Sequence, residues 1–144
     1  MARLKKHFHG RKRGTLLVEA AIMIPLVLML TFVLIEGGWL MLKAEQIENA
    51  ARQGARKAAL SGSTTGDVDN VISTIMTSAG LPSYVKTYTP ADPSTAKHGD
   101  PIQINVKVAY ANISLTKVTS IFSYYGGTNT TPTYIGSTVT MTKE

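Results

Sequence analysis

The stretch RKRGTLLVEAAIMIPLVLMLTFVLI, which runs from Arg11 to Ile35, is the most informative part of the sequence. It begins with basic residues and Gly14, and the 21 residues from Thr15 to Ile35 contain a single charged residue, Glu19. A helix of that length is about 30 Å long, which matches the hydrocarbon core of a bilayer. The stretch therefore predicts a membrane-spanning helix. Glu19 is unusual there, because a carboxylate near the centre of a bilayer costs at least ~2.5 kcal/mol.

Two other features of this apolar run bear on its interpretation. A secretory signal peptide would have an apolar region of about 7–15 residues that ends in a small-residue cleavage site. This run is longer and no such site follows it, but an uncleaved signal anchor stays open as an alternative. Pro25 removes one helix hydrogen bond and is expected to kink or loosen the span, unless it is a tolerated membrane proline without a role.

The net charge of the chain is concentrated at its N-terminus. Residues 1–14 contain six Lys or Arg and no acid, while the rest contains nine bases and nine acids, which gives a formal net charge of +6. A basic tail can bind nucleic acid, but here it directly precedes a predicted span, which favours the positive-inside rule. We therefore expect a cytoplasmic N-terminus, an exported remainder and no nucleic-acid partner. His7 and His9 have no third metal ligand nearby, so we expect no metal site.

The helix is expected to continue beyond the membrane, because residues 36–60 contain no proline and carry small or apolar residues at helical spacing. Glu48, Arg52 and Arg56 follow at intervals of four on another face, where they can pair along the surface. Trp39 lies where the chain should leave the lipid, a position that suits an interfacial tryptophan. The apolar stripe is expected to pack within the chain, with packing against another subunit as the alternative. It consists of Leu40, Ala44, Ile47, Ala51, Ala55 and Ala58.

The rest of the chain predicts a small exterior α+β domain. After a linker at 61–66, we expect a second helix that Thr65 caps, that has Asp67 and Asp69 near its positive end, and that ends at Gly80. Its buried face would be Val68, Val71, Ile72, Ile75, Met76 and Ala79. Alternation predicts strands at 84–89, 102–110 and 134–142, separated by a loop at 90–101 and an ambiguous segment at 111–132, in which Val118, Ile121 and Phe122 fit a short amphipathic turn.

The predicted fold class is therefore α+β. A long N-terminal helix, first membrane-spanning and then amphipathic, is expected to pack against a small antiparallel sheet with one further helix. The expected organisation is a basic cytoplasmic leader at 1–14, a transmembrane helix at 15–36, its continuation outside the membrane at 37–60 and an exterior domain at 61–144.

Residues that carry catalysis are scarce in this sequence. There is no cysteine, which excludes disulfides and thiol chemistry. The exported part has a single histidine, His98, too few for a hydrolase triad or a zinc site, and there is no P-loop or dinucleotide fingerprint. The sequons at 112–114 and 129–131 fit N-glycosylation, but the pattern is weak. We expect a non-enzyme without cofactor or metal.

A family resemblance begins at Gly14. The run from Gly14 to Glu19, a glycine after a basic leader and a glutamate five residues later that opens an apolar helix, resembles the type IV prepilin pattern. More narrowly, the chain resembles a TadE-like pseudopilin, or minor pilin, of the tight-adherence (Tad/Flp) pilus system. Pro25 would be the eleventh residue after cleavage, and Asn49 to Arg56, NAARQGAR, is similar to that family's "NAAREGAR" run. Ala20 departs from the pattern, since such proteins often carry an aromatic residue there.

The resemblance implies specific roles and partners. A prepilin peptidase would cleave between Gly14 and Thr15, and Glu19 would pair with the new α-amine of Thr15 on an adjacent subunit during assembly. Pro25, Asn49, Ala51, Arg52, Gly54, Ala55 and Arg56 would be features of the shared helix. The partners would be the lipid bilayer, the peptidase, other pilin or pseudopilin subunits and the pilus assembly platform.

The same resemblance implies a single-pass inner-membrane protein with an exterior C-terminal domain that is incorporated into a pilus. An unprocessed, signal-anchored adhesion protein is the main alternative, and an anchored exterior enzyme is another. Glu19 can also be a carboxylate that snorkels to the interface or stays protonated.

Overall fold

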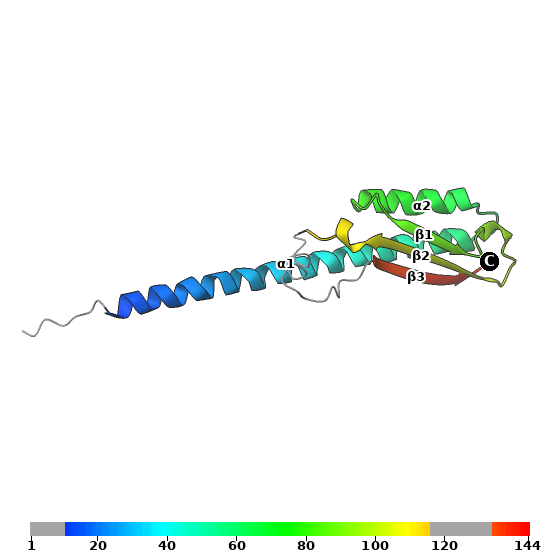
Figure 1. Ribbon diagram of the computed structural model, residues 1–144. Helices are drawn as coiled ribbons and strands as arrows, with labels where there is room; N and C mark the ends of the chain where they lie inside the picture. Colours follow the sequence, from blue (N-terminus) through cyan, green and yellow to red (C-terminus); the bar gives the residue numbers. More distant parts are fainter. Residues whose placement is uncertain (1–10, 116–133) are drawn as a thin grey trace, which may run out of the picture. The chain divides into compact units, whose positions relative to one another are not determined.

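The computed structural model describes residues 11–115 and 134–144, which divide into two compact units between Gly37 and Gly38 (Figure 1). The elements are a long helix, a short helix, three strands and two 3-10 turns, which confirms the predicted α+β fold class. In chain order they are α1 (Arg11–Ala59), α2 (Thr65–Ser78), β1 (Val85–Thr89), η1 (Pro93–Thr95), β2 (Pro101–Ala109), η2 (Tyr110–Asn112) and β3 (Tyr134–Thr142). The amphipathic turn expected around Ile121 lies outside the described residues.

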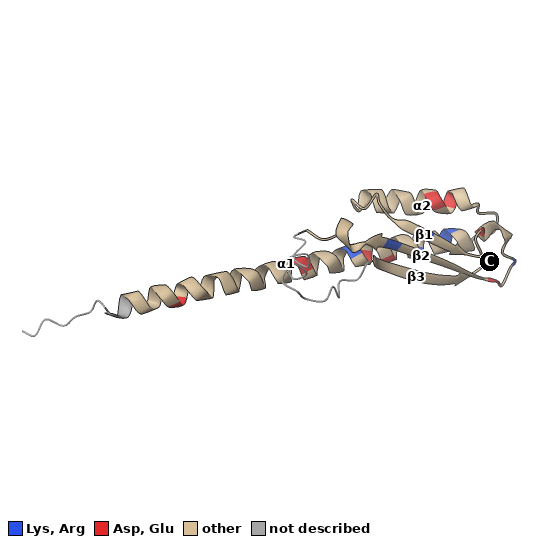
Figure 2. Ribbon diagram, viewed as in Figure 1, with Lys and Arg blue, Asp and Glu red and all other residues tan. Residues whose placement is uncertain are grey.

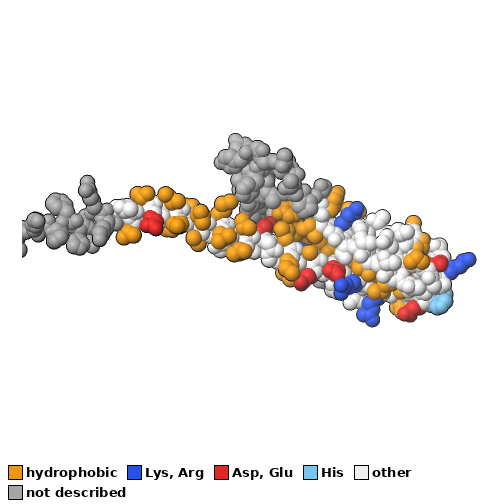
Figure 3. Space-filling model, turned by 90° about the horizontal axis from the view of Figure 1, so that it is seen from below, with side chains coloured by type: hydrophobic (Ala, Val, Ile, Leu, Met, Phe, Trp, Pro, Cys, Tyr) orange, Lys and Arg blue, Asp and Glu red, His pale blue; other side chains and the backbone are white. Residues whose placement is uncertain are grey.

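The described part of the N-terminal unit is the first part of α1. Its large apolar side chains are exposed, and Figure 3 shows hydrophobic side chains along the face of it that is in view. Among the described residues, α1 is the one helix long and apolar enough to cross a membrane. The last four residues of the leader expected at 1–14 belong to the helix, since α1 begins at Arg11. No proline interrupts RKRG, and a single glycine weakens a helix by only about 1 kcal/mol.

The C-terminal unit contains an antiparallel sheet with the strand order β1-β2-β3. The central strand β2 follows the predicted alternation, because Ile102, Ile104, Val106 and Val108 are all fully buried. Half-buried Ile135, Val139 and Met141 of β3 pack against the same core, as predicted. The prediction that the second strand extends to Tyr110 is wrong, because β2 ends at Ala109 and the chain turns into η2.

Both helices lie on one face of the sheet and share one core with it. The predicted stripe of α1 is confirmed, since Ile47, Ala51, Ala55 and Ala58 are fully buried. The buried surface is wider than predicted and also includes Ala50, Gly54 and Ala59. This part of α1 packs against both β2 and α2. More of its surface is therefore buried than a single stripe of small residues would cover.

The start of α2 differs from the prediction by one residue. Thr64 is the N-cap: its hydroxyl accepts a hydrogen bond from the Asp67 backbone N–H, and the Asp67 carboxylate accepts one from the Thr64 backbone N–H. This reciprocal capping box satisfies two helix-terminal donors, which Thr65 as the cap would not do. The predicted end is confirmed, because α2 ends at Ser78 and Gly80 follows with a φ of 70°.

Candidate processing and assembly site

The first turns of α1 carry the three residues that sequence analysis singled out. Gly14, Thr15 and Glu19 are all exposed. Thr15 and Glu19 are four residues apart on one helix, so their side chains lie on the same face, one turn from each other. A Cβ atom added at Gly14 would have no other heavy atom within 4 Å, so this position is sterically open. The region around the Gly14–Thr15 bond is therefore accessible within the described part of the chain.

Pro25 lies within α1, which continues on both sides of it as a helix. Because proline has no N–H, the carbonyl of Ala21 loses its usual helical partner. The expected local loosening of the span concerns this one hydrogen bond and does not end the helix. The predicted role of Pro25 stays a prediction.

The run from Asn49 to Arg56 separates into a buried and an exposed half. Ala51, Gly54 and Ala55 are buried in the core, whereas Asn49 and Arg56 are exposed. Gly54 is in the closest contact: a Cβ atom at this position would lie 2.8 Å from Cγ1 and Cδ1 of Ile72 and 3.6 Å from Cδ1 of Ile104. The small residues of this run therefore allow α1 to approach α2 and β2.

On the exposed side of the same run, Arg52 forms an ion pair with Glu48, one turn earlier. This pairing confirms the prediction for these two residues. Both side chains are well exposed, so the pair contributes little to stability.

The interfacial position predicted for Trp39 stays a prediction, and the residue also packs within the C-terminal unit. It is half-buried against the core, and its indole N–H donates a hydrogen bond to the Ile113 carbonyl over 2.9 Å. The Lys43 ammonium lies 4.5 Å from the centroid of the Trp39 ring and donates a hydrogen bond to the Ala79 carbonyl, the C-cap of α2. Trp39 and Lys43 therefore connect this part of α1 to η2 and to α2.

Lys143 has a corresponding role at the end of α1. Its side chain is buried, and its ammonium donates hydrogen bonds of 2.9 Å to the carbonyls of Ala58 and Leu60. The backbone N–H of Glu144 donates to the Ala59 carbonyl. A cation that satisfies the last carbonyls of a helix also complements the negative end of its dipole. Lys43 and Lys143 were missed by sequence reasoning, because a lysine that caps a helix far away in the sequence leaves no local pattern.

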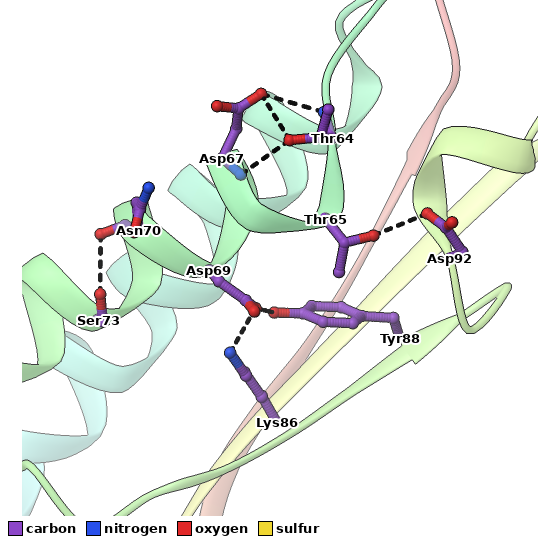
Figure 4. A network of polar contacts seen from close by, with 9 residues as sticks. All are labelled: Thr64, Thr65, Asp67, Asp69, Asn70, Ser73, Lys86, Tyr88 and Asp92. Carbon is purple, nitrogen blue, oxygen red and sulfur yellow. Dashed lines mark hydrogen bonds and ion pairs between the residues drawn. The ribbon is translucent and has the colours of Figure 1, made fainter.

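A polar network connects the first turns of α2 to the sheet and to η1 (Figure 4). The Asp69 carboxylate accepts a hydrogen bond from the Tyr88 hydroxyl and pairs with the Lys86 ammonium. Partial burial opposes ionisation of Asp69, but the hydrogen bonds and charge of its two partners outweigh it and lower the pKa of Asp69. The pKa of Tyr88 is raised by burial and by the adjacent carboxylate. The Thr65 hydroxyl also donates a hydrogen bond to Asp92, at the N-cap of η1.

The remaining polar groups do not assemble into a reactive centre. Figure 2 shows that the described charged residues are distributed along several elements of the C-terminal unit. Over residues 11–115 and 134–144, no three His, Asp or Glu side chains lie close enough together to bind a metal ion. His98 lines an open hollow of about 300 Å³ together with Glu144 and Lys143, whose ammonium is engaged by the carbonyls of α1.

Taken together, a long apolar helix and a small α+β domain define a protein with a single N-terminal segment suited to a membrane anchor. Residues 14–56 match the family model described as TadE-like protein, which confirms the resemblance for the part of the chain that holds Gly14, Glu19 and the run from Asn49 to Arg56. This part of the chain is thus TadE-like. No curated protein and no solved structure matches the chain.

Proposed function

We propose that this protein is a pilin-like assembly protein of a Tad pilus system, anchored in the inner membrane, which a prepilin peptidase cleaves after Gly14. The observation that supports this most directly is the position of Gly14 and Glu19 at the start of an exposed apolar helix, inside the TadE-like match. On this proposal the protein acts by binding lipid and other subunits and the assembly platform. It has no catalytic activity of its own.

The proposed cleavage follows from the local chemistry of Gly14. A peptidase that cuts beside a membrane helix must fit the residue before the bond into a narrow site, and glycine has no side chain to clash. The bond lies in the first turn of α1, where the leading N–H groups have no intrahelical partners, and Gly14 weakens the helix further. Unwinding this turn into the peptidase site is therefore less costly than unwinding the helix interior.

Cleavage would give Glu19 a partner. Thr15 would then carry a free α-amine, which is positive below a pKa of about 7.7–8.0. A carboxylate in lipid is stabilised by a cation, and a neighbouring subunit displaced along the helix axis would bring its Thr15 amine to Glu19. The pair would set the stagger between adjacent subunits. It would also neutralise the carboxylate of Glu19, the one charged side chain in the apolar segment.

The proposed orientation places the N-terminus in the cytoplasm and the C-terminal unit outside, since the first fourteen residues carry the whole net charge. A reporter that is active only outside the cytoplasm, fused after Glu144, is expected to be active. Activity of a strictly cytoplasmic reporter at that site would contradict the orientation.

Replacement of Gly14 tests the proposed processing, and the structure supplies a matched control. A Cβ atom added at Gly14 or at Gly37 would have no other heavy atom within 4 Å, so neither glycine is required by close packing. Immunoblots of membranes are expected to show only the full-length band for Gly14→Val and the lower-mass band for Gly37→Val. A lower-mass band in Gly14→Val would contradict cleavage after Gly14, and absence of that band in the wild type would favour an unprocessed signal-anchored adhesion protein.

A further inference from the structure

The exposed large hydrophobic side chains of the C-terminal unit gather at one end of it. Among its described residues, six such side chains are exposed, namely Met41, Leu42, Leu60, Val85, Leu115 and Tyr134. Single exposed apolar residues are ordinary, but five of these six lie together. The exception is Leu60, which lies beside the end of β3, where the backbone of Glu144 bonds to Ala59.

The strand register places three of the five side chains at the same end of the domain. β1 begins at Val85 opposite Lys107 of β2, and β3 begins at Tyr134 opposite Ala109, the last residue of β2. Leu115 follows three residues after η2, which begins where β2 ends. Val85, Leu115 and Tyr134 therefore lie near the end of the sheet where β1 and β3 begin and β2 ends.

The hydrogen bond between Trp39 and Ile113 brings this end of the sheet beside the first residues of α1 in the unit. Met41 and Leu42, the other two exposed side chains, follow Trp39 directly and are 67% and 46% exposed. We call this surface the Trp39 end, and it consists of Trp39, Met41, Leu42, Val85, Leu115 and Tyr134.

The composition of the Trp39 end suits the boundary between lipid and water. The Lys107 ammonium lies 5.7 Å from the centroid of the exposed Tyr134 ring, and Trp39 is half-buried with its polar N–H engaged. Aromatic side chains and lysines with apolar stems are enriched at membrane interfaces, where one end of each is apolar and the other is hydrated. Lysine, by contrast, is depleted at protein–protein interfaces.

The connection to the anchor is short enough to hold this surface at the membrane. Trp39 is four residues after Ile35, the last residue of the apolar run. Because α1 continues as a helix through these residues, four residues rise about 6 Å along it. That rise is within the headgroup region of a bilayer, which adds roughly 5–8 Å on each side of the hydrocarbon core.

We propose that the Trp39 end is a lipid-contacting surface, which rests on the phospholipid headgroups while the protein resides in the membrane. The inference rests on the membrane anchor of the proposed function and is independent of cleavage after Gly14. The apolar side chains would enter the outer edge of the headgroup layer, and Lys107 would favour anionic lipid. The domain would thus be held against the membrane until it is withdrawn into an assembly.

Depth-dependent quenching on the full chain in phospholipid vesicles tests this inference. The sequence has no cysteine, so Leu115→Cys and Leu60→Cys each provide a single site for an environment-sensitive fluorophore. The two positions are comparably exposed, at 53% and 46%, and lie at opposite ends of the domain. Each labelled protein is mixed with vesicles that carry a nitroxide quencher in the lipid headgroup, and separately with aqueous iodide. Co-flotation with the vesicles verifies that the anchor is inserted.

The label at position 115 is expected to be quenched several-fold more strongly by the headgroup nitroxide than the label at position 60, and less strongly by iodide. Equal quenching of both labels in floating samples would overturn the inference. Protection of position 115 from both quenchers would also overturn it, because protein would then cover this surface. Failure of flotation would instead count against the membrane anchor itself, and so against the proposed function.

Discussion

Gly54 of α1 lies directly against Ile72 of α2, with no room between them for a side chain at position 54. A Cβ atom there would lie 2.8 Å from two carbon atoms of the fully buried Ile72 side chain. Both helices lie on the same face of the sheet, and Ile104 of β2 is the next neighbour of Gly54. The spacing between the two helices and the sheet therefore depends on the absence of a side chain at Gly54.

Replacement of Gly54 by alanine should destabilise the exterior domain. Overpacking of a core typically costs about 1–3 kcal/mol, and alanine gains about 1 kcal/mol in helix propensity over glycine, so we expect a net loss of up to about 2 kcal/mol. Gly66→Ala in α2 is the matched control, because an added Cβ atom there would meet only the Thr64 hydroxyl oxygen, at 3.7 Å. It should be neutral or stabilising by up to about 1 kcal/mol. Urea unfolding in detergent, followed by Trp39 fluorescence, measures both, and a stabilising Gly54→Ala would refute the close contact.

Removal of the Lys143 ammonium should destabilise the C-terminal end of α1. Lys143→Met keeps the buried apolar stem but leaves the carbonyls of Ala58 and Leu60 without this donor. Leaving buried acceptors unsatisfied costs about 1–3 kcal/mol. Lys97→Met is the same substitution at an exposed lysine and should have almost no effect on stability. Equal unfolding midpoints for the two variants would show that the cap contributes nothing.

The contribution of Asp69 to stability should depend on pH. Its pKa in the folded protein is below its ordinary value of 3.8, because the bonds from Lys86 and Tyr88 outweigh its partial burial. A lowered pKa adds stability above pH 3.8, and this stability is lost as the pH falls through the lower folded value. The difference in unfolding free energy between wild type and Asp69→Asn should therefore be constant from pH 5 to 7 and shrink below pH 4. A difference that grows toward acidic pH would contradict this assignment.

Much of this fold follows from local patterns in the sequence. Two patterns were sufficient to predict the helices and the central strand: the period of 3.6 in α1 and α2, and the alternation from Ile102 to Val108. They were sufficient because each of these elements packs against the same core. The choice between Thr64 and Thr65 as the cap was not predictable, since both residues can cap and only the side-chain geometry of Asp67 distinguishes them. The hydrogen bonds from Lys43 and Lys143 to distant helix ends were also not predictable from the sequence, because they depend on tertiary packing.

Only part of the candidate site was predictable from the sequence. The spacing from Gly14 to Glu19 is visible in the sequence, and the structure adds that these residues are exposed on α1. The buried role of Gly54 required the position of Ile72, which no sequence pattern supplies. The proposed partner of Glu19 belongs to a second subunit. Its role therefore follows from the resemblance and the spacing, and not from a contact within the chain.

Glu19→Gln tests that role after cleavage. The substitution keeps the shape of the side chain and removes its charge, so the α-amine of Thr15 on the adjacent subunit would lose its partner. Breaking a buried ion pair on one side typically costs about 3–5 kcal/mol. We expect the variant to insert and to be cleaved, at an unchanged or lower rate, but to co-purify poorly with pilin partners. Glu48→Gln, which disrupts an exposed pair, is the control. Wild-type levels of co-purification and surface pili in Glu19→Gln would make Glu19 a tolerated acid near the interface.

The mass of the protein isolated from membranes tests the central claim most directly. Intact mass spectrometry of the native chain, with sequencing of its first residues, distinguishes processing from anchoring without any substitution. The account predicts a protein that lacks residues 1–14 and begins at Thr15 with the α-amine that Glu19 requires. A chain that still carries Met1 to Gly14, or that begins at any other residue, would contradict it.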